Sequence, residues 1–203
     1  VSSDDKLLNL SASGGVFSCI ATDLLQDGGF VCGCSMEFKN EMLSPEHILI
    51  DSTDKLYKLQ GSKYVQSNSL QIYGKIKEKL EEERKVLFSG TPCQVAALKE
   101  FLGREYEKLY TIDIICHGTP SARIFQDYIK NLEKQIKGRI EEFKFRDKSN
   151  GWGLKGSVEY IDQKGKKKKK IIPVQLSSYY KLFQDALIYR ENCYSCKYAG
   201  QNR

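Results

Sequence analysis

The spacing of apolar residues along the chain predicts helices that alternate with short strands. Where apolar positions recur every three or four residues, helices are predicted at residues 16–25, 53–59, 69–83, 93–102, 121–137 and 177–190. Short apolar runs predict strands at residues 30–36, 48–50, 85–88 and 110–115. Ser13 is expected to cap the first helix. The strand–helix–strand order over residues 85–115 predicts a βαβ unit, in which the two strands run parallel.

Beyond residue 138 apolar and polar residues alternate instead, as is typical of strands with one buried face. Stretches at residues 140–145, 154–161 and 168–174 are separated by turn residues and predict an antiparallel layer. The expected fold class is therefore α/β, a mixed sheet with a parallel βαβ core flanked by helices, plus an antiparallel β-rich portion. Because no flexible linker interrupts the chain, we expect a single domain over residues 1–203, with the β-rich portion at 139–175 and a cysteine-containing tail at 191–203.

The charge is concentrated in one place. Six lysines, at position 164 and positions 166–170, account for the whole net charge of +6. Lys164 lies in a predicted turn at residues 162–165 and the other five lysines follow it, so together they form the exposed arm of a hairpin. This arm is either a solvated edge guarded by lysine or a docking site for an acidic partner, and nucleic-acid binding is not expected. No apolar run is long enough to cross a membrane and residues 1–10 do not resemble a signal peptide, so we expect a cytoplasmic protein.

Seven cysteines at irregular spacing favour reduced thiols over a disulfide framework. Cys93 and Cys116 each follow a strand of the βαβ unit, so they should emerge at the same carboxyl edge of the sheet, where α/β proteins bind ligands. Cys193 and Cys196 form a C-x-x-C pair that could converge on one metal. These four thiols would suit a [4Fe–4S] cluster or zinc, although Cys93 and Cys116 could equally be buried packing residues. The others are expected to pack in the core: Cys19, Cys32 and Cys34.

Two polar segments could contact a cofactor. Residues 11–15 place small residues at a helix start, which permits close approach to a pyrophosphate. Residues 61–67 combine a lysine, a tyrosine and hydroxyls in a loop that could grip a phosphate or a flavin edge, although an ordinary surface loop has a similar composition. His47 is expected to be incidental. His117, beside Cys116, either bonds to a cofactor or holds the loop.

Six segments together resemble the coenzyme F420 hydrogenase/dehydrogenase beta-subunit family. In chain order they are S-x-S-G-G-V-F-S, G-S-K-Y-V-Q-S, F-S-G-T-P-C-Q, D-I-I-C-H-G-T-P-S, F-R-D-K-S-N-G-W and C-Y-S-C-K-Y-A. The resemblance implies an FAD- and [4Fe–4S]-containing oxidoreductase. The implied FAD contacts are Ser13, Gly14, Gly15, Ser62, Lys63, Tyr64, Gln66 and Thr91, the implied cluster ligands are Cys93, Cys116, Cys193 and Cys196, and the implied catalytic residues are Lys63 and His117.

The resemblance also implies a role and partners. The domain would bind flavin and pass electrons between a two-electron carrier, F420 or another, and an iron–sulfur relay. Its partners would be a soluble electron carrier and a redox protein or ferredoxin-like domain, in a homo- or hetero-oligomer. Family members continue past the C-x-x-C, so the chain resembles an excerpt of a longer protein. The alternative is a non-catalytic binding module with a structural four-cysteine zinc site and a lysine-rich docking arm.

Overall fold

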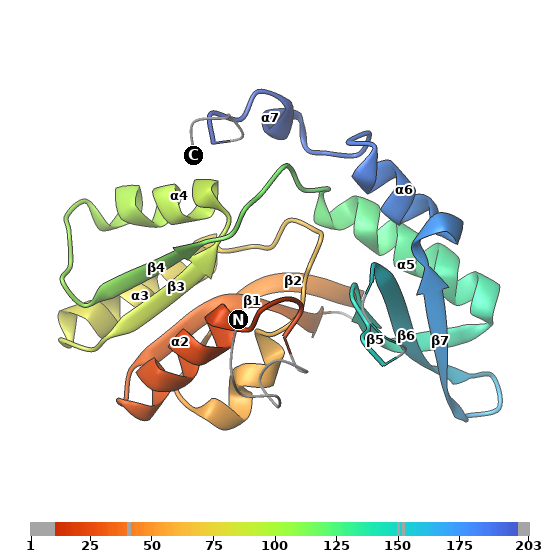
Figure 1. Ribbon diagram of the computed structural model, residues 1–203, viewed down its shortest axis with the longest axis horizontal. Helices are drawn as coiled ribbons and strands as arrows, with labels where there is room; N and C mark the ends of the chain where they lie inside the picture. The colour runs from red at the N-terminus through yellow and green to blue at the C-terminus, as the bar shows by residue number, and fades with distance from the viewer. Residues whose placement is uncertain (1–10, 40–41, 150, 152, 199–203) are drawn as a thin grey trace.

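The computed structural model describes residues 11–39, 42–149, 151 and 153–198, so the last five residues of the predicted tail lie outside it. Strands and helices alternate as the apolar spacing predicted, and the α/β fold class is confirmed (Figure 1). The elements are α2 (Val16–Gln26), β1 (Phe30–Lys39), β2 (Met42–Ile50), the 3₁₀ helix η1 (Thr53–Lys58), α3 (Leu70–Glu81), β3 (Val86–Gly90), α4 (Pro92–Leu102), β4 (Leu109–Asp113), α5 (Ala122–Ile136), β5 (Gly138–Lys144), β6 (Lys155–Asp162), β7 (Lys167–Pro173), the 3₁₀ helix η2 (Val174–Leu176), α6 (Ser178–Gln184) and α7 (Glu191–Tyr194).

The first sheet has the strand order β2-β1-β3-β4. Strands β1, β3 and β4 are parallel, and β2 returns antiparallel to β1 along its whole length. Helices α3 and α4 cover one face around Phe88 and Ile76, while α2 and η1 cover the other around Val31 and Leu87. Because both faces are covered, the central strand β3 is apolar from Val86 to Phe88 rather than alternating, whereas the edge strand β4 carries polar and partly exposed residues.

The second sheet has the order β5-β6-β7 and is antiparallel. It packs against α5 and α6 at the other end of the molecule (Figure 1). Aromatic rings fill this core, where Phe125 of α5 meets Phe143 of β5 at 5.3 Å between ring centroids. The buried Tyr180 hydroxyl donates to the Phe145 carbonyl, which fixes α6 to the end of β5.

Several predicted boundaries differ from the structure, two of them by six residues, and the predicted cap of the first helix also differs in its position. Strand β2 begins at Met42 rather than at residue 48. The prediction missed its first half because Pro45 and the polar residues beside it interrupt the apolar pattern, although proline is tolerated in an edge strand such as β2. The helix predicted to reach residue 190 ends at Gln184, and Ala186 then adopts a positive φ of 57°. Ser13 is not a cap: Gly15, with φ 79°, occupies the N-cap of α2 and no side chain caps that helix.

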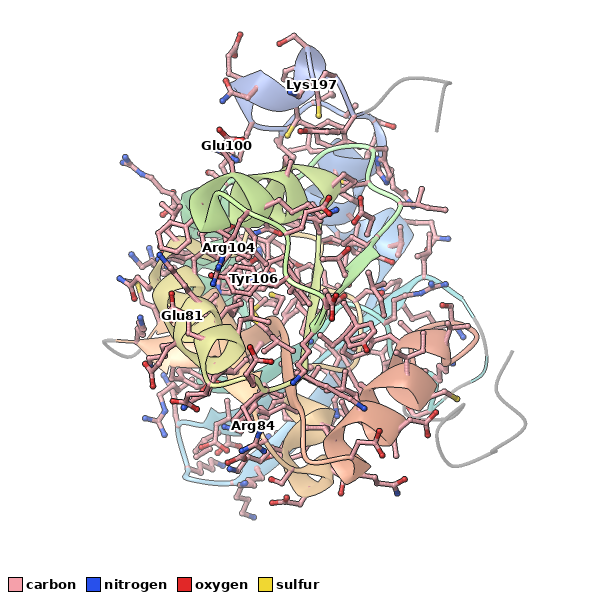
Figure 2. All side chains as sticks on the ribbon, turned by 90° about the vertical axis from the view of Figure 1, so that its left-hand side faces the viewer. Glu81, Arg84, Glu100, Arg104, Tyr106 and Lys197 are labelled. Atoms are coloured by element: carbon pink, nitrogen blue, oxygen red, sulfur yellow. The ribbon has the colours of Figure 1, made fainter. Side chains whose placement is uncertain are left out.

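The lysine run forms the exposed β6–β7 hairpin, as predicted, but much of its charge is neutralised internally. Lys167, Lys168 and Lys169 pair with Glu141, Asp162 and Asp147, respectively. In the α4–β4 connection at the opposite end, the Arg104 guanidinium lies 4.5 Å from the Tyr106 ring centroid (Figure 2). No helix among the described residues is long and apolar enough to span a membrane.

Candidate functional site

A cavity of about 510 Å³ opens where the parallel strands end. The sheet forms part of its wall through Gly33 of β1, Gly90 of β3 and Ile114, which lies just past β4. The remaining walls come from the start of α2, the loop at residues 60–67 and the loop at residues 115–119. The carboxyl edge of a parallel sheet is where α/β folds bind ligands, and this volume falls within the range of about 300–1,000 Å³ typical of ligand pockets.

The start of α2 forms one wall of this cavity. Ser13, Gly14 and Gly15, which the sequence suggests as cofactor contacts, line it. Because no side chain caps the helix, the N–H groups of its first turn are left for another acceptor. Ser18, one turn into α2, shares a hydrogen bond of 2.9 Å with Ser11. The positive end of the helix dipole and the bare N–H groups together favour an anion here.

Lys63 is the one lysine or arginine among the described residues that line the cavity. Its ammonium donates to the carbonyls of Lys58 at 3.2 Å and Gln60 at 2.7 Å. Burial lowers the pKa of Lys63 to about 8, because the charged form loses hydration. The ammonium is therefore still mostly protonated at neutral pH and is held in place by the two carbonyls.

The rest of the 60–67 loop is fixed by contacts with distant segments. Tyr64 stacks on Phe183 at 5.1 Å between centroids, and its carbonyl accepts from the Tyr179 hydroxyl. Gln66 accepts at its Oε1 from the Thr119 hydroxyl at 3.0 Å. Ser62, Tyr64 and Gln66, all predicted from the sequence, line the cavity beside Lys63.

His47 lines the cavity and is buried, which differs from the incidental role expected for it. Its Nε2 donates to the Ser89 carbonyl at 3.1 Å, so its Nδ1 accepts from the Ser67 hydroxyl at 3.0 Å. The ring stacks on Phe88 at 5.2 Å. Burial lowers the pKa of His47 to about 4, although the bond to Ser89 opposes that shift. The imidazole is consequently neutral at physiological pH.

The hydrogen-bond network continues to the start of α4. Gln94 donates from Nε2 to the Ser67 hydroxyl at 3.0 Å and accepts at Oε1 from the Thr91 backbone N–H at 3.1 Å. Thr91, which the sequence suggests as an FAD contact, lines the cavity, but its hydroxyl serves the capping box of α4. Strand β2, the 60–67 loop, β3 and α4 are thereby joined beneath the cavity.

The cysteines divide differently from the sequence prediction. Cys32 is fully buried in the core, as expected. Cys34 does not pack in the core as expected but lies partly buried in the cavity wall, near Lys63 and Ser67. Burial raises the pKa of its thiol. Cys19 is partly buried on α2.

The four predicted cluster ligands do not form a ready-made metal site. Cys93 is exposed at the start of α4 with its sulfur 3.1 Å from the Thr91 hydroxyl, and Cys116 lines the cavity. Cys193, in α7, approaches the Thr119 carbonyl at 4.0 Å, and Cys196 follows it, partly buried. Across the described residues, no group of three or more histidine, cysteine, aspartate or glutamate side chains could hold a metal ion.

The C-terminal segment closes over the 115–119 loop. The exposed His117 bonds to the Tyr189 hydroxyl through Nδ1 and packs its ring 5.2 Å from that of Phe183. Gly118 has a φ of 137°, and a Cβ there would lie 2.1 Å from the Tyr189 ring. Only glycine permits this contact. The segment that follows, with Lys197, lies above α4 in both views (Figures 1 and 2).

Comparison with known proteins gives a family and a fold. Residues 83–202 match the family model for the C-terminal part of the beta subunit of coenzyme F420 hydrogenase/dehydrogenase. No curated protein matches the chain. A solved structure that matches is a chain of the xenon-derivatised F420-reducing [NiFe] hydrogenase complex from Methanosarcina barkeri, with a TM-score of 0.56 and 15% sequence identity. The match covers 96% of the present chain but 63% of that one.

At this level of identity the matched structure establishes the fold alone. The family match is independent of it and extends over more than half of the chain, including β3, α4 and all four predicted cluster ligands. The chain therefore belongs to the coenzyme F420 hydrogenase/dehydrogenase beta-subunit family, a family of redox enzymes, as its sequence motifs predicted.

Proposed function

We propose that the cavity binds FAD and that the chain is the flavin-binding part of an oxidoreductase. One observation carries the proposal: an uncapped helix start and a buried lysine face the same cavity, at the carboxyl edge of a parallel sheet. The first favours a pyrophosphate. The second favours negative charge on a phosphate or on a reduced flavin ring.

Each wall of the cavity has a part in this proposal. Gly14 and Gly15 let the pyrophosphate approach the backbone N–H groups of α2, because they carry no Cβ. Lys63, held by two carbonyls, keeps a positive charge at a fixed position. Neutral His47 and Gln94 hold Ser67 and the 60–67 loop against β3. The loop at residues 115–119 and Phe183 form another wall of the cavity.

Bound FAD would supply the exchange between two-electron and one-electron carriers. The protein supplies orientation and charge. His117, at the cavity edge, is placed to contact either the flavin or its reaction partner. The two-electron carrier would be F420 or another hydride donor, and the one-electron carrier a redox partner protein in the same assembly. A role in a multisubunit complex is suggested by the hydrogenase complex that the fold matches.

The iron–sulfur cluster is not supported by the geometry as it stands. Four thiolates are the correct donor set for [4Fe–4S]. However, the predicted ligands are not gathered in the described structure, and Cys93 is exposed while Cys193 lies against Thr119. The same separation counts against the alternative of a structural zinc site. We therefore assign no step to a cluster, and a cluster at these cysteines requires that they move together.

The proposal is tested by paired glycine variants. Gly15→Val adds a side chain at the proposed pyrophosphate site, whereas Gly103→Val adds one at the end of α4, where the backbone φ is also positive. Both variants carry similar backbone strain, but only Gly15 lines the cavity. We expect Gly15→Val to lose FAD binding and Gly103→Val to retain it. Equal FAD affinity in two folded variants, checked by circular dichroism, would show that FAD does not bind at α2.

A further inference from the structure

A second hollow, of about 530 Å³, lies between α5 and the edge strand β7. We call it the α5–β7 groove. None of its lining residues belongs to the proposed flavin cavity. Apolar side chains along it are unusually exposed: Leu176 of η2 is 84% exposed, Ile124 of α5 38% and Leu182 of α6 37%. An apolar groove that stays open to solvent is typical of a surface that another polypeptide covers.

Strand β7 gives this groove an unpaired edge. Among the described strands, β7 pairs with β6 alone, so the N–H and C=O groups of its outer side have no strand beside them. Such an edge can accept an added strand from another chain. In Figure 1, β7, α5 and α6 stand together at the end of the molecule away from β3 and α4.

The charge on β7 selects what can pair with that edge. Lys167, Lys168 and Lys169 are matched by acidic residues of the same chain. Lys170 lines the groove, is exposed and forms no ion pair within the described structure. Lysines along an edge repel a second copy of the same strand, whereas an opposite charge directly across a strand pair is stabilising.

We propose that the α5–β7 groove docks an extended acidic segment of a partner protein, which adds a strand along β7. Carboxylates of that segment would meet Lys170, and the apolar residues between them would cover Leu176 and Ile124. Asp127 also lines the groove, on the α5 side. Its charge disfavours carboxylates there and so sets the side on which the acidic residues lie. A second copy of the chain is disfavoured because its β7 carries the same lysines.

Peptide binding to the whole chain tests this proposal. The probes are two fluorescent seven-residue peptides, matched in length to β7, with valine alternating with glutamate in one and with lysine in the other. Fluorescence anisotropy at low and high salt measures their affinities. We expect saturable, salt-sensitive binding of the glutamate peptide alone. Leu176→Asp and Lys170→Glu should each weaken it by about tenfold or more, which corresponds to roughly 1.4 kcal/mol.

Lys164→Glu is the matched control, because it makes the same charge change in the exposed turn outside the groove. It should weaken binding clearly less than Lys170→Glu. Equal affinity for both peptides, no saturable binding, or equal effects of the two lysine variants would overturn the proposal. Concentration-dependent dimerisation that Leu176→Asp abolishes would overturn it too, by assigning the groove to a second copy.

Discussion

Replacing His47 tests how the network beneath the cavity is held together. Burial lowers the pKa of His47 from 6.5 to about 4. The unfolded chain therefore binds this proton more readily than the folded chain, and folding stability falls as pH decreases from about 6.5 to about 4. One pKa unit corresponds to about 1.36 kcal/mol, so the full loss is about 3 kcal/mol, and it is complete below the folded pKa.

The assay is urea unfolding between about pH 7.5 and about pH 4, at roughly half-unit steps, with His47→Gln beside the parent. Glutamine can donate to Ser89 and accept from Ser67 but has no proton to gain in this range. We expect the parent to lose about 3 kcal/mol more than the variant across this window.

Asp147 acts in a different window and can be separated. Burial alone would raise the pKa of the Asp147 carboxyl, but hydrogen bonds from Lys169, Ser149 and Ser157 hold that pKa well below its usual 3.8. The contribution of Asp147 to folding stability is therefore lost only as pH falls below about 3.8.

If the stability of His47→Gln and that of the parent have the same pH slope between about pH 6.5 and about pH 4, then His47 is not held neutral and its place in the network is wrong.

Three further experiments address separate parts of the site. Lys63→Met should stabilise the FAD-free chain by about 1–3 kcal/mol at pH 7, because a buried cation is removed, and this gain should vanish above the normal lysine pKa of 10.5. The same variant should bind FAD about tenfold more weakly. A destabilised variant with unchanged FAD affinity would contradict both statements. Gly118→Ala should lower the free energy of unfolding in urea by at least about 1–3 kcal/mol, because the residue has a positive φ and lies against the Tyr189 ring. Gly74→Ala, where an added Cβ meets open space, should not lower it. Equal unfolding midpoints for the two variants would refute the Gly118–Tyr189 contact. After anaerobic reconstitution with iron and sulfide, any visible cluster absorption should disappear in Cys93→Ser and Cys193→Ser but persist in Cys19→Ala, and persistence in the serine variants would exclude these ligands.

Local patterns predicted most of the fold. The βαβ unit from β3 to β4 was predictable because apolar runs, Pro92 at the first turn and Gly103 at the end of α4 all indicate the same elements. The β-rich portion was predictable from alternation alone. Strand β2 was not, because Pro45 interrupts its apolar pattern, and an edge strand depends on its neighbour rather than on its own residues.

Long-range contacts limited the prediction of the site. His47 reaches Ser89, 42 residues away, and no local pattern signals that bond. Cys34 shares its strand face with the buried Cys32, so alternation placed both in the core. However, the pairing of β1 with β3 ends at Cys32, and Cys34 lies beyond that point, where the cavity begins. Gly14, Gly15, Lys63 and Gln66 were predicted as cofactor contacts from motifs rather than from periodicity, and all four line the cavity.

FAD titration of the whole chain tests the central claim most directly. Binding is followed by quenching of flavin fluorescence, with riboflavin, which lacks the pyrophosphate, titrated in parallel. If the start of α2 and Lys63 bind the pyrophosphate, FAD should bind saturably at one site and about tenfold or more tighter than riboflavin. No saturable binding of FAD, or equal affinities for FAD and riboflavin, would contradict the assignment of this cavity.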